Sequence, residues 1–366
     1  MKNNTGNARQ TFFKRIRESS LFWPLTALVF ILIFDAIYAP GFFKIGILDG
    51  HLYGNLIDVV NDGAPLMLVA IGMTMVIATG GVDLSVGAVM AIAASTACIM
   101  LNPNLVGYKL ADVTREADPT YSFTPLFFVF LVPLIISAIC GLWNGLLVAY
   151  GKIQPMVATL ILMIAGRGIA QLVTNAIKII IYNDTFLQLG NGWLFLLPAA
   201  LYIAAIVFAI AWFITRKSSL GMFIESVGIN SRSSFFSGID EKKIKLFAYV
   251  FCGICAGIAG MVAVSSIRTS DANQVGLYFE LDAILAVIIG GTLLGTGGRF
   301  SLLASAIGAL VIQATTTSSL AIGVPASALI AVKAVVVIVV ILLYSQQVRD
   351  FIQKITSRTS QKEVKS

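Results

Sequence analysis

The sequence predicts an all-α, polytopic membrane protein with about ten transmembrane helices and both termini in the cytoplasm. Three observations carry this prediction: the composition, the number of apolar runs and the distribution of basic residues. Of the 366 residues, 58% are hydrophobic and 12% are charged, whereas soluble domains carry about 25% charged residues. A soluble enzyme, a disordered chain and a nucleic-acid-binding domain are therefore excluded, although the formal net charge is +7.

Ten apolar runs account for this composition, and most approach the roughly 20 residues that cross a bilayer. The first follows a polar, basic start, residues 1–20, and ends at Pro40-Gly41 without a small-x-small cleavage site. We therefore expect an uncleaved span rather than a signal peptide. The expected spans are residues 21–39, 64–79, 84–101, 123–149, 155–175, 193–215, 246–266, 282–296, 301–320 and 326–344.

The basic residues indicate the orientation of these spans. With ten spans, 18 of the 25 basic residues fall on the side that holds both termini and five on the opposite side. Because basic loops favour the cytoplasm, we expect a cytoplasmic segment 1–20, one transmembrane domain 21–345 and a cytoplasmic tail 346–366. The chain has no GxxxxGK[ST] phosphate-binding motif and no loop large enough to be a domain. Any ATP must therefore be hydrolysed by another chain.

The densest polar motif is Ile77-Ala-Thr-Gly-Gly-Val-Asp-Leu-Ser-Val-Gly87, between two short apolar runs. Irregular backbone at membrane depth is stable only where it is buried in protein or lines a wet cavity, and transporters build substrate paths from such broken helices. Asp83 is placed to accept the free N–H groups of the following helix. The residues alone leave two roles open for Asp83: a helix cap and a group in the translocation path.

Other polar residues within the spans are functional candidates, because burying them in a bilayer is costly. Arg167 lies between two glycines, and pairing with a buried acid is favoured for it over contact with a solute. Asn144 offers a neutral hydrogen-bonding group that suits a polar uncharged solute. Lys333 begins the last run and is interpreted as structural. A second glycine-rich break, Leu281 to Gly291, resembles the first break and suggests a distant internal duplication.

The expected cytoplasmic segment 216–245 combines glycines with apolar side chains, among them Met222, Phe235 and Phe236. One interpretation is a helix lying on the membrane surface. The alternative is a short helix that docks into a groove of a cytoplasmic partner, and the length of this segment beside the other short inner loops favours the partner.

Three stretches, Thr79 to Gly87, Gly221 to Asn230 and Glu280 to Gly291, resemble the permease subunits of bacterial ribose/galactose/xylose-type sugar ABC importers. The resemblance runs from about residue 21 to 345 and is strongest to the galactofuranose permease branch, with Ile71-Gly-Met-Thr, Leu160 to Gly168 and Asp271-Ala-Asn-Gln as further matches. It implies a multi-pass protein of the bacterial cytoplasmic membrane that imports a monosaccharide by alternating access. Galactofuranose or galactose is the first expectation, and fructose and ribose are the others.

The resemblance also implies partners. Two permeases, the same or related, form the pore, and a cytoplasmic ATPase that uses ATP-Mg docks on the inner loop of each. A periplasmic or lipid-anchored binding protein delivers the sugar to the outer loops 40–63 and 267–281. On this basis we expect Glu225, Gly228 and Asn230 at the docking surface and Asp83, Asn144 and Arg167 near the path. No cofactor or metal is expected on this chain. The role of outer loop 102–122 is left open.

The main rival interpretation is an ion-coupled secondary sugar transporter, in which Asp83 or Arg167 would relay protons. An integral-membrane transferase would need paired carboxylates at the membrane face, and the sequence offers only Glu280 and Asp282 as a close acidic pair facing a span. Transport therefore explains the sequence better than catalysis.

Overall fold

The computed structural model describes residues 20–48, 50–101, 125–292, 294 and 297–344. Within these ranges a helix overlaps every expected apolar run, so the all-α prediction is confirmed. The helices of these runs are α2 (Phe22–Tyr38), α3 (Asn55–Ala78), α4 (Val86–Leu101), α5 (Leu126–Ala149), α6 (Pro155–Val173), α8 (Ala199–Lys217), α11 (Glu241–Ile267), α12 (Phe279–Ile289), α13 (Leu302–Ala321) and α14 (Leu329–Tyr344). The loop 102–122 and the tail 346–366 lie outside the described residues, as does nearly all of segment 1–20.

Six helices in the described ranges are long and apolar enough to cross a membrane, namely α3, α5, α6, α8, α11 and α13. The chain is therefore a membrane protein, while the total of ten spans stays a prediction because α2, α4, α12 and α14 are shorter. Helix α3 begins at Asn55, nine residues before the expected run. Asp58 and Asp62 suggest a loop by composition, but their spacing places them on one face of a helix.

Helix α11 packs against α3, α4 and α5, and these contacts depend on small residues. A Cβ atom added to Gly141 of α5 would overlap the carbonyl oxygen of Tyr249, and one added to Gly260 would overlap the carbonyl of Met90. Small residues allow helix backbones to approach closely where the hydrophobic effect does not drive association. The glycines of α5 and α11 therefore explain how the central helices pack.

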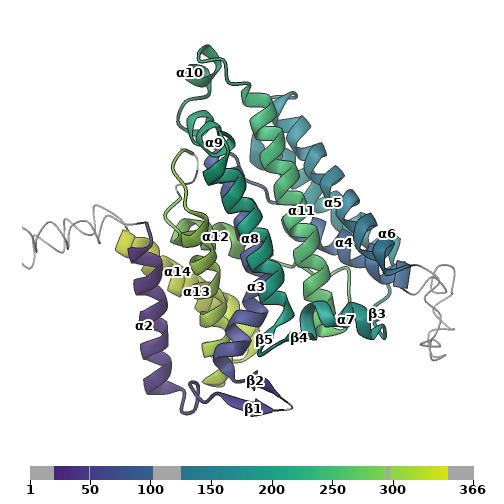
Figure 1. Cartoon of the computed structure of the whole chain (residues 1–366), viewed down its shortest axis with the longest axis vertical. Helices are drawn as coiled ribbons and strands as arrows, with labels where there is room; N and C mark the ends of the chain where they lie inside the picture. The colour runs from purple at the N-terminus through teal and green to yellow at the C-terminus, as the bar shows by residue number, and fades with distance from the viewer. Residues whose placement is uncertain (1–19, 49, 102–124, 293, 295–296, 345–366) are drawn as a thin grey trace, which may run out of the picture.

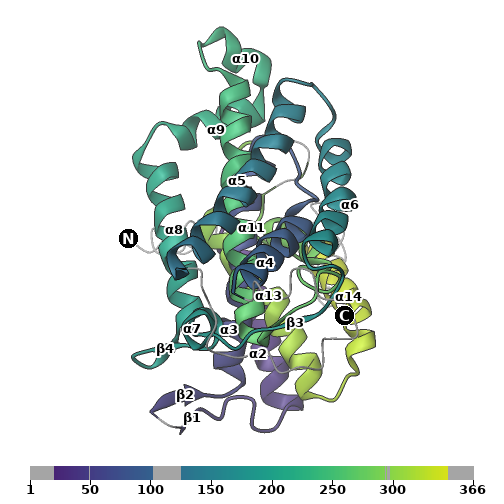
Figure 2. The ribbon, with the colours of Figure 1, turned by 90° about the vertical axis from the view of Figure 1, so that its right-hand side faces the viewer.

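Three short ribbons, which the all-α prediction did not include, lie at one end of the described structure, together with α7 (Asp184–Asn191) (Figures 1 and 2). We call this the outer end. His51 stacks on Trp193 with ring centroids 5.1 Å apart, so the single histidine joins two of the ribbons. The paired strands are β1 (Gly46–Leu48) with β2 (His51–Tyr53), β3 (Ile179–Ile180) with β6 (Thr269–Ser270), and β4 (Trp193–Leu194) with β5 (Leu197–Pro198).

The opposite end, which we call the inner end, carries two short helices, α9 (Leu220–Ile229) and α10 (Ser231–Phe236) (Figure 1). They lie between α8 and α11, within the expected cytoplasmic segment 216–245. The segment is therefore folded, and its short helices contact α3, α8 and α11.

Candidate functional site

The break between α3 and α4 is held by a buried hydrogen-bond network around Asp83. The Oδ1 atom of Asp83 accepts bonds from the Ser85 N–H (2.9 Å), the Ser85 hydroxyl (2.6 Å) and the Asn144 amide (3.3 Å). The same amide donates to the Ser85 hydroxyl oxygen (2.8 Å). Asp83 and Asn144 are almost fully buried. The N–H that Asp83 accepts belongs to Ser85, the residue directly before α4, and the structure joins Asp83 to Asn144 across 61 positions of sequence.

The depth of this break can be measured along α11, because an α-helix rises 1.5 Å per residue. Tyr249, whose hydroxyl donates to the Val82 carbonyl (3.3 Å), has its backbone about 12 Å along the axis from the start of α11 at Glu241. Met90 of α4 contacts Gly260, which lies about 28 Å from that start. The chain from residue 79 to 85 therefore runs into the interior before α4 begins.

A second irregular segment, residues 271–278, contacts the start of α4 inside the protein. A Cβ atom added to Gly276 would lie only 2.6 Å from the Gly87 carbonyl oxygen, and one added to Gly87 would overlap the Gly276 carbonyl. Gly276 has φ +66°, a conformation that glycine adopts without strain. Because α12 begins at Phe279, two helices start beside each other inside the protein.

Arg167 stabilises this second segment from α6. Its guanidinium donates to the carbonyl of Ala272 (3.2 Å) and to the carbonyl of Val275. Carbonyls freed from a helix at membrane depth need such donors. The expected pairing with an acid takes a different form, because among the described residues Arg167 makes hydrogen bonds to carbonyls rather than an ion pair.

Glu280 nevertheless lies next to Arg167. A Cβ atom added to Gly87 would lie 3.3 Å from the Arg167 guanidinium and would overlap Glu280 Oε2. Glu280 is 7% exposed, and its Oε2 atom has no hydrogen-bond partner in the described structure. The sequence places Glu280 in an acidic pair and at the start of a family motif but assigns it no role near the path, because nothing in the local sequence shows that Gly87 of a distant motif faces it.

The two glycine-rich breaks meet at the inner end. The backbone N–H of Gly298 donates to the carbonyl of Ala78, the last residue of α3 (2.8 Å). Gly228 of α9 covers this bond so closely that an added Cβ atom would overlap both the Ala78 oxygen and the Gly298 nitrogen. Gly298 has φ +95°, which favours glycine. Helix α9 therefore rests directly on the junction of both breaks.

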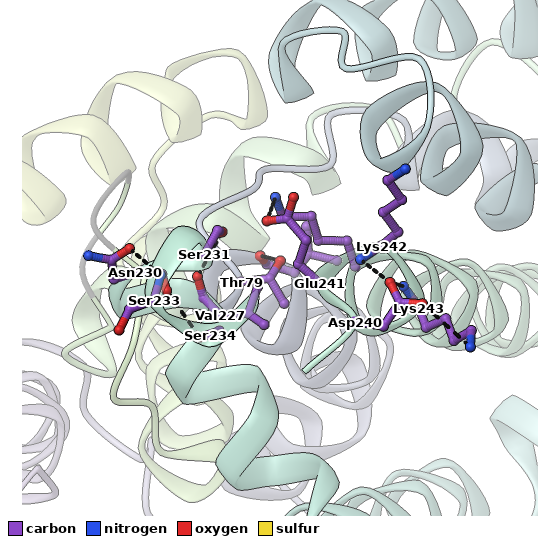
Figure 3. A network of polar contacts seen from close by, with 12 residues as sticks. Thr79, Val227, Asn230, Ser231, Ser233, Ser234, Asp240, Glu241, Lys242 and Lys243 are labelled. Carbon is purple, nitrogen blue, oxygen red and sulfur yellow. Dashed lines mark hydrogen bonds and ion pairs between the residues drawn. The ribbon is translucent and has the colours of Figure 1, made fainter. Parts of the chain in front are cut away.

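The three expected docking residues lie on α9, which holds Glu225 and Gly228, and at the N-cap of α10, which is Asn230. Gly228 points inward to the junction, Glu225 is half-buried, and Asn230 is exposed. The Asn230 side chain accepts a bond from the Ser233 N–H (3.0 Å) and so caps α10 (Figure 3). Phe235 and Phe236 are 66% and 80% exposed. The outward apolar surface at the inner end therefore includes this phenylalanine pair, together with the exposed Met222 and Ile229 of α9, and not Gly228.

Helix α11 begins with a capped first turn next to α10. Asp240 Oδ1 accepts a bond from the Lys242 N–H (3.1 Å), and Asp240 Oδ2 lies 3.4 Å from the Lys243 ammonium (Figure 3). Desolvation raises the pKa of the Asp240 carboxyl, but the hydrogen bonds from Lys243 and Lys242 outweigh it and leave the pKa below its usual value. The next residue, Glu241, forms an ion pair with Lys245, which lies one turn further along α11 (3.3 Å).

A pocket of about 460 Å³ opens between these elements. Thr79, Ser231 and Glu241, which Figure 3 shows close together, line it from α3, α10 and α11. Hydroxyl, amide and charged groups alternate with apolar side chains around it. The lining residues are Thr79, Gly80, Gly81, Val148, Ala149, Lys152, Ile153, Gln154, Pro155, Val227, Gly228, Ser231, Glu241, Lys245 and Tyr249.

Lys333 forms an ion pair with Asp282 of α12 (2.7 Å) and so attaches α14, which agrees with its structural interpretation. A second buried contact, which sequence reasoning did not find, joins α2 to α13: Ser318 donates to Asp35 Oδ2 (2.7 Å). Asp35 stands alone in an apolar run, and its partner lies 283 positions away. Only the packing of the helices reveals this pair.

A family model described as the permease component of the branched-chain amino acid transport system matches residues 55–344. The chain belongs to this permease family. It is 46% identical over 342 residues to the galactofuranose transporter permease protein YtfT of Escherichia coli (strain K12), covering 92% of this chain and 94% of the relative. No solved structure matches the chain significantly.

The fructose import permease protein FruF of Bifidobacterium longum is 34% identical, with 93% of this chain and 91% of the relative covered. The ribose import permease protein RbsC of Haemophilus influenzae is 31% identical, with 85% of this chain and 87% of the relative covered. The resemblance to sugar permeases, strongest to the galactofuranose branch, is confirmed. The chain is a transport permease and not an enzyme.

Proposed function

We propose that this permease is the membrane-spanning subunit of an ATP-driven ABC importer that carries a monosaccharide, with galactofuranose or galactose as the first candidate, across the bacterial cytoplasmic membrane. The observation that supports it most is the 46% identity to a galactofuranose permease over nearly the whole chain. Fructose and ribose are the next candidates, since permeases for both are relatives. The family description names branched-chain amino acids, so leucine is the control substrate.

Two groups of polar side chains, joined by the backbone of residues 82–87, support the proposed path. The path begins at Glu280 and Arg167, passes Gly87 to the Asp83–Ser85–Asn144 network, and reaches the inner pocket through Tyr249. The three residues expected near the path all belong to these two groups. Asp83 and Asn144 are buried, so the path is closed at their level in this conformation. We place the switch between outward and inward access at this network.

The junction beneath α9 supports coupling to a cytoplasmic ATPase. Helices α9 and α10 present the exposed Phe235 and Phe236 outward and Gly228 inward, against Ala78 and Gly298. A partner that moves α9 thereby moves the ends of both breaks. Coupling requires that the docked loop make different contacts in the two states of the transporter. We therefore assign residues 216–245 as the ATPase-docking segment, with ATP-Mg bound by the partner.

Reconstitution tests this function. The permease is placed in proteoliposomes with the ATPase, the binding protein and any second permease encoded in neighbouring genes. Uptake of labelled D-galactose, D-fructose, D-ribose and leucine is then compared. We expect uptake of one sugar only with ATP and all partners present, and no effect of a protonophore. Uptake by the permease alone that collapses with the protonophore would instead establish the ion-coupled alternative, and uptake of leucine only would exclude a sugar.

A further inference from the structure

The inner pocket carries a function that neither the family nor the relatives assign. It lies where α9, α10, α11 and the turn between α5 and α6 surround residues 79–81. We propose that this pocket is a monosaccharide-binding site at the cytoplasmic end of the path, from which the sugar leaves the permease. This inference rests on the proposed function, and it adds a defined site with residues that can be tested separately.

The size and shape of the pocket fit such a ligand. Its volume of about 460 Å³ falls within the range of about 300–1,000 Å³ that small-molecule sites occupy. Gly80 has φ +83°, and a Cβ atom added to it would meet no atom within 4 Å. The backbone at Gly80 therefore borders open space, while the N–H groups of Gly80 and Gly81 donate to carbonyls of α3.

The chemistry of the lining matches a neutral ring that carries hydroxyl groups. The Thr79 hydroxyl donates to the Val76 carbonyl (2.8 Å) and the Ser231 hydroxyl to the Val227 carbonyl (3.0 Å), so both oxygens keep lone pairs for a ligand hydroxyl. Gln154 adds an amide with donors and an acceptor. Val148 and Ile153 offer apolar contacts to the C–H groups of a sugar ring.

The charges of the pocket favour an uncharged ligand. Glu241 and Lys245 neutralise each other at 3.3 Å, and Lys152 is exposed to solvent. A compact anion would need a desolvated cluster of donors, which this lining lacks. A sugar can bond to both partners of an ion pair, because its hydroxyl groups donate and accept.

The position of the pocket connects it to both ends of the mechanism. Its deep wall includes Tyr249, whose hydroxyl donates to Val82 beside the Asp83 network. Its outer wall includes Gly228 and Ser231, on the segment assigned to ATPase docking. A shift of α9 and α10 therefore changes the pocket itself, so that ATPase movement alters the affinity of the site and releases the sugar.

Cysteine protection tests the site in the assembled complex, held in nanodiscs without the binding protein. Gln154→Cys is labelled with a small charged methanethiosulfonate reagent, with and without the sugar that the complex imports. If sugar occupies the pocket, labelling should slow about threefold at a concentration near twice the dissociation constant, because the free fraction of the site equals 1/(1 + [L]/Kd). Ser231→Cys probes the opposite wall and serves if Gln154→Cys does not assemble.

Two controls are matched to this experiment. The unsubstituted chain sets the background, since three of its free cysteines are buried and Cys140 is half-buried. Thr185→Cys, exposed on α7 at the outer end, should label at the same rate with or without sugar. Leucine at the same concentration should protect none of the variants.

The outcomes separate the site from the proposed function. Sugar uptake by the unsubstituted complex together with unprotected labelling at both pocket positions would overturn the site and leave the function standing. Protection by ATPase docking alone, with no effect of sugar, would also overturn it, since the pocket would then be part of the partner interface. Absence of uptake for every sugar in the complete complex would instead refute the proposed function.

Discussion

The Gly298 N–H donates to the Ala78 carbonyl across 2.8 Å, which joins the ends of two helix breaks that are 220 positions apart. Ala78 is the last residue of α3, and Gly298 lies between α12 and α13. Each break contains glycines with left-handed backbone angles. Gly228 of α9 lies on this bond. The contact gives a single point through which a docked partner can act on both halves of the permease.

Replacing Gly228 tests that point. A Cβ atom there would overlap the Ala78 oxygen, so Gly228→Ala must displace α9 from the junction, and Gly228→Val must displace it further. We expect both variants to assemble with the ATPase and hydrolyse ATP while sugar uptake falls by about tenfold or more, which corresponds to at least 1.4 kcal/mol. The measurement is the number of sugar molecules imported per ATP in proteoliposomes.

Gly168→Ala on α6 is the control for Gly228, because a Cβ atom at Gly168 would meet nothing within 4 Å. It should transport normally. Full uptake by Gly228→Val would remove α9 from the coupling mechanism.

Asp83 carries two proposed roles, which two substitutions separate. Asp83→Asn keeps an oxygen that accepts from the Ser85 N–H, whereas Asp83→Leu leaves the Ser85 N–H and the Ser85 hydroxyl without their acceptor and removes one of the two bonds of the Asn144 amide. An unsatisfied buried group costs about 1–3 kcal/mol, so the leucine variant should have a lower melting temperature in detergent and the asparagine variant should not. If Asp83 is also part of the path, Asp83→Asn should be stable and yet import sugar more slowly.

Normal import by a stable Asp83→Asn variant would exclude Asp83 from the path and leave capping as its one role. Ser85→Ala, which removes one hydroxyl from the network but neither backbone bond nor charge, is the control for a small loss of stability.

Much of the fold follows from hydrophobicity, and the polar break around Asp83 shows where the sequence also indicates the site. The run lengths predict the helices, and Gly80-Gly81 followed by Asp83 predicts a break with a capped helix start. The exceptions have local causes. Helix α12 ends at Ile289 because Gly291 takes a left-handed conformation with φ +83°. Gly290 between them packs against Ser305 of α13, a contact that composition cannot show.

The contacts between motifs could not be predicted, because each partner is remote in sequence. Gly87 and Gly276 meet only when α4 and α12 start at the same depth. Arg167 carries a charge that suggests an acidic partner, yet it bonds to carbonyls of an irregular segment that a hydropathy profile treats as an outer loop. Gly228 looks like a docking residue in a polar loop, whereas packing turns it inward. The type of a side chain therefore indicates that a position matters to the structure or function, and only the fold shows which residue it contacts.

Arg167 should control the order of residues 271–278. Arg167→Lys keeps the charge but loses the planar fork that bonds both the Ala272 and Val275 carbonyls. Hydrogen bonds to charged groups contribute about 1.5–3 kcal/mol, so amide exchange in this segment should accelerate by roughly tenfold or more. Mass spectrometry of deuterated peptides measures this.

Gln171→Ala serves as the control for Arg167, because Gln171 also bonds to the segment, through the exposed Asn273 side chain at 2.5 Å. Its effect on exchange should be smaller. Equal exchange in Arg167→Lys and the unsubstituted chain would show that the carbonyl contacts do not hold the segment.

The Lys333–Asp282 ion pair should be the main polar attachment of α14, because it is largely buried, with the side chains 22% and 16% exposed. Removing one partner of a buried pair leaves an uncompensated charge and costs about 3–5 kcal/mol. We therefore expect Lys333→Ala and Asp282→Ala each to lower the melting temperature strongly. The exchanged double variant, Asp282→Lys with Lys333→Asp, should recover much of the loss, since it restores the pair.

Lys243→Ala is the control, because it breaks the solvent-exposed pair with Asp240. Such pairs contribute at most about 1 kcal/mol, so this variant should change the melting temperature little. If the double variant is no more stable than the single variants, the two side chains act independently and α14 is held by its apolar contacts with α12 and α13.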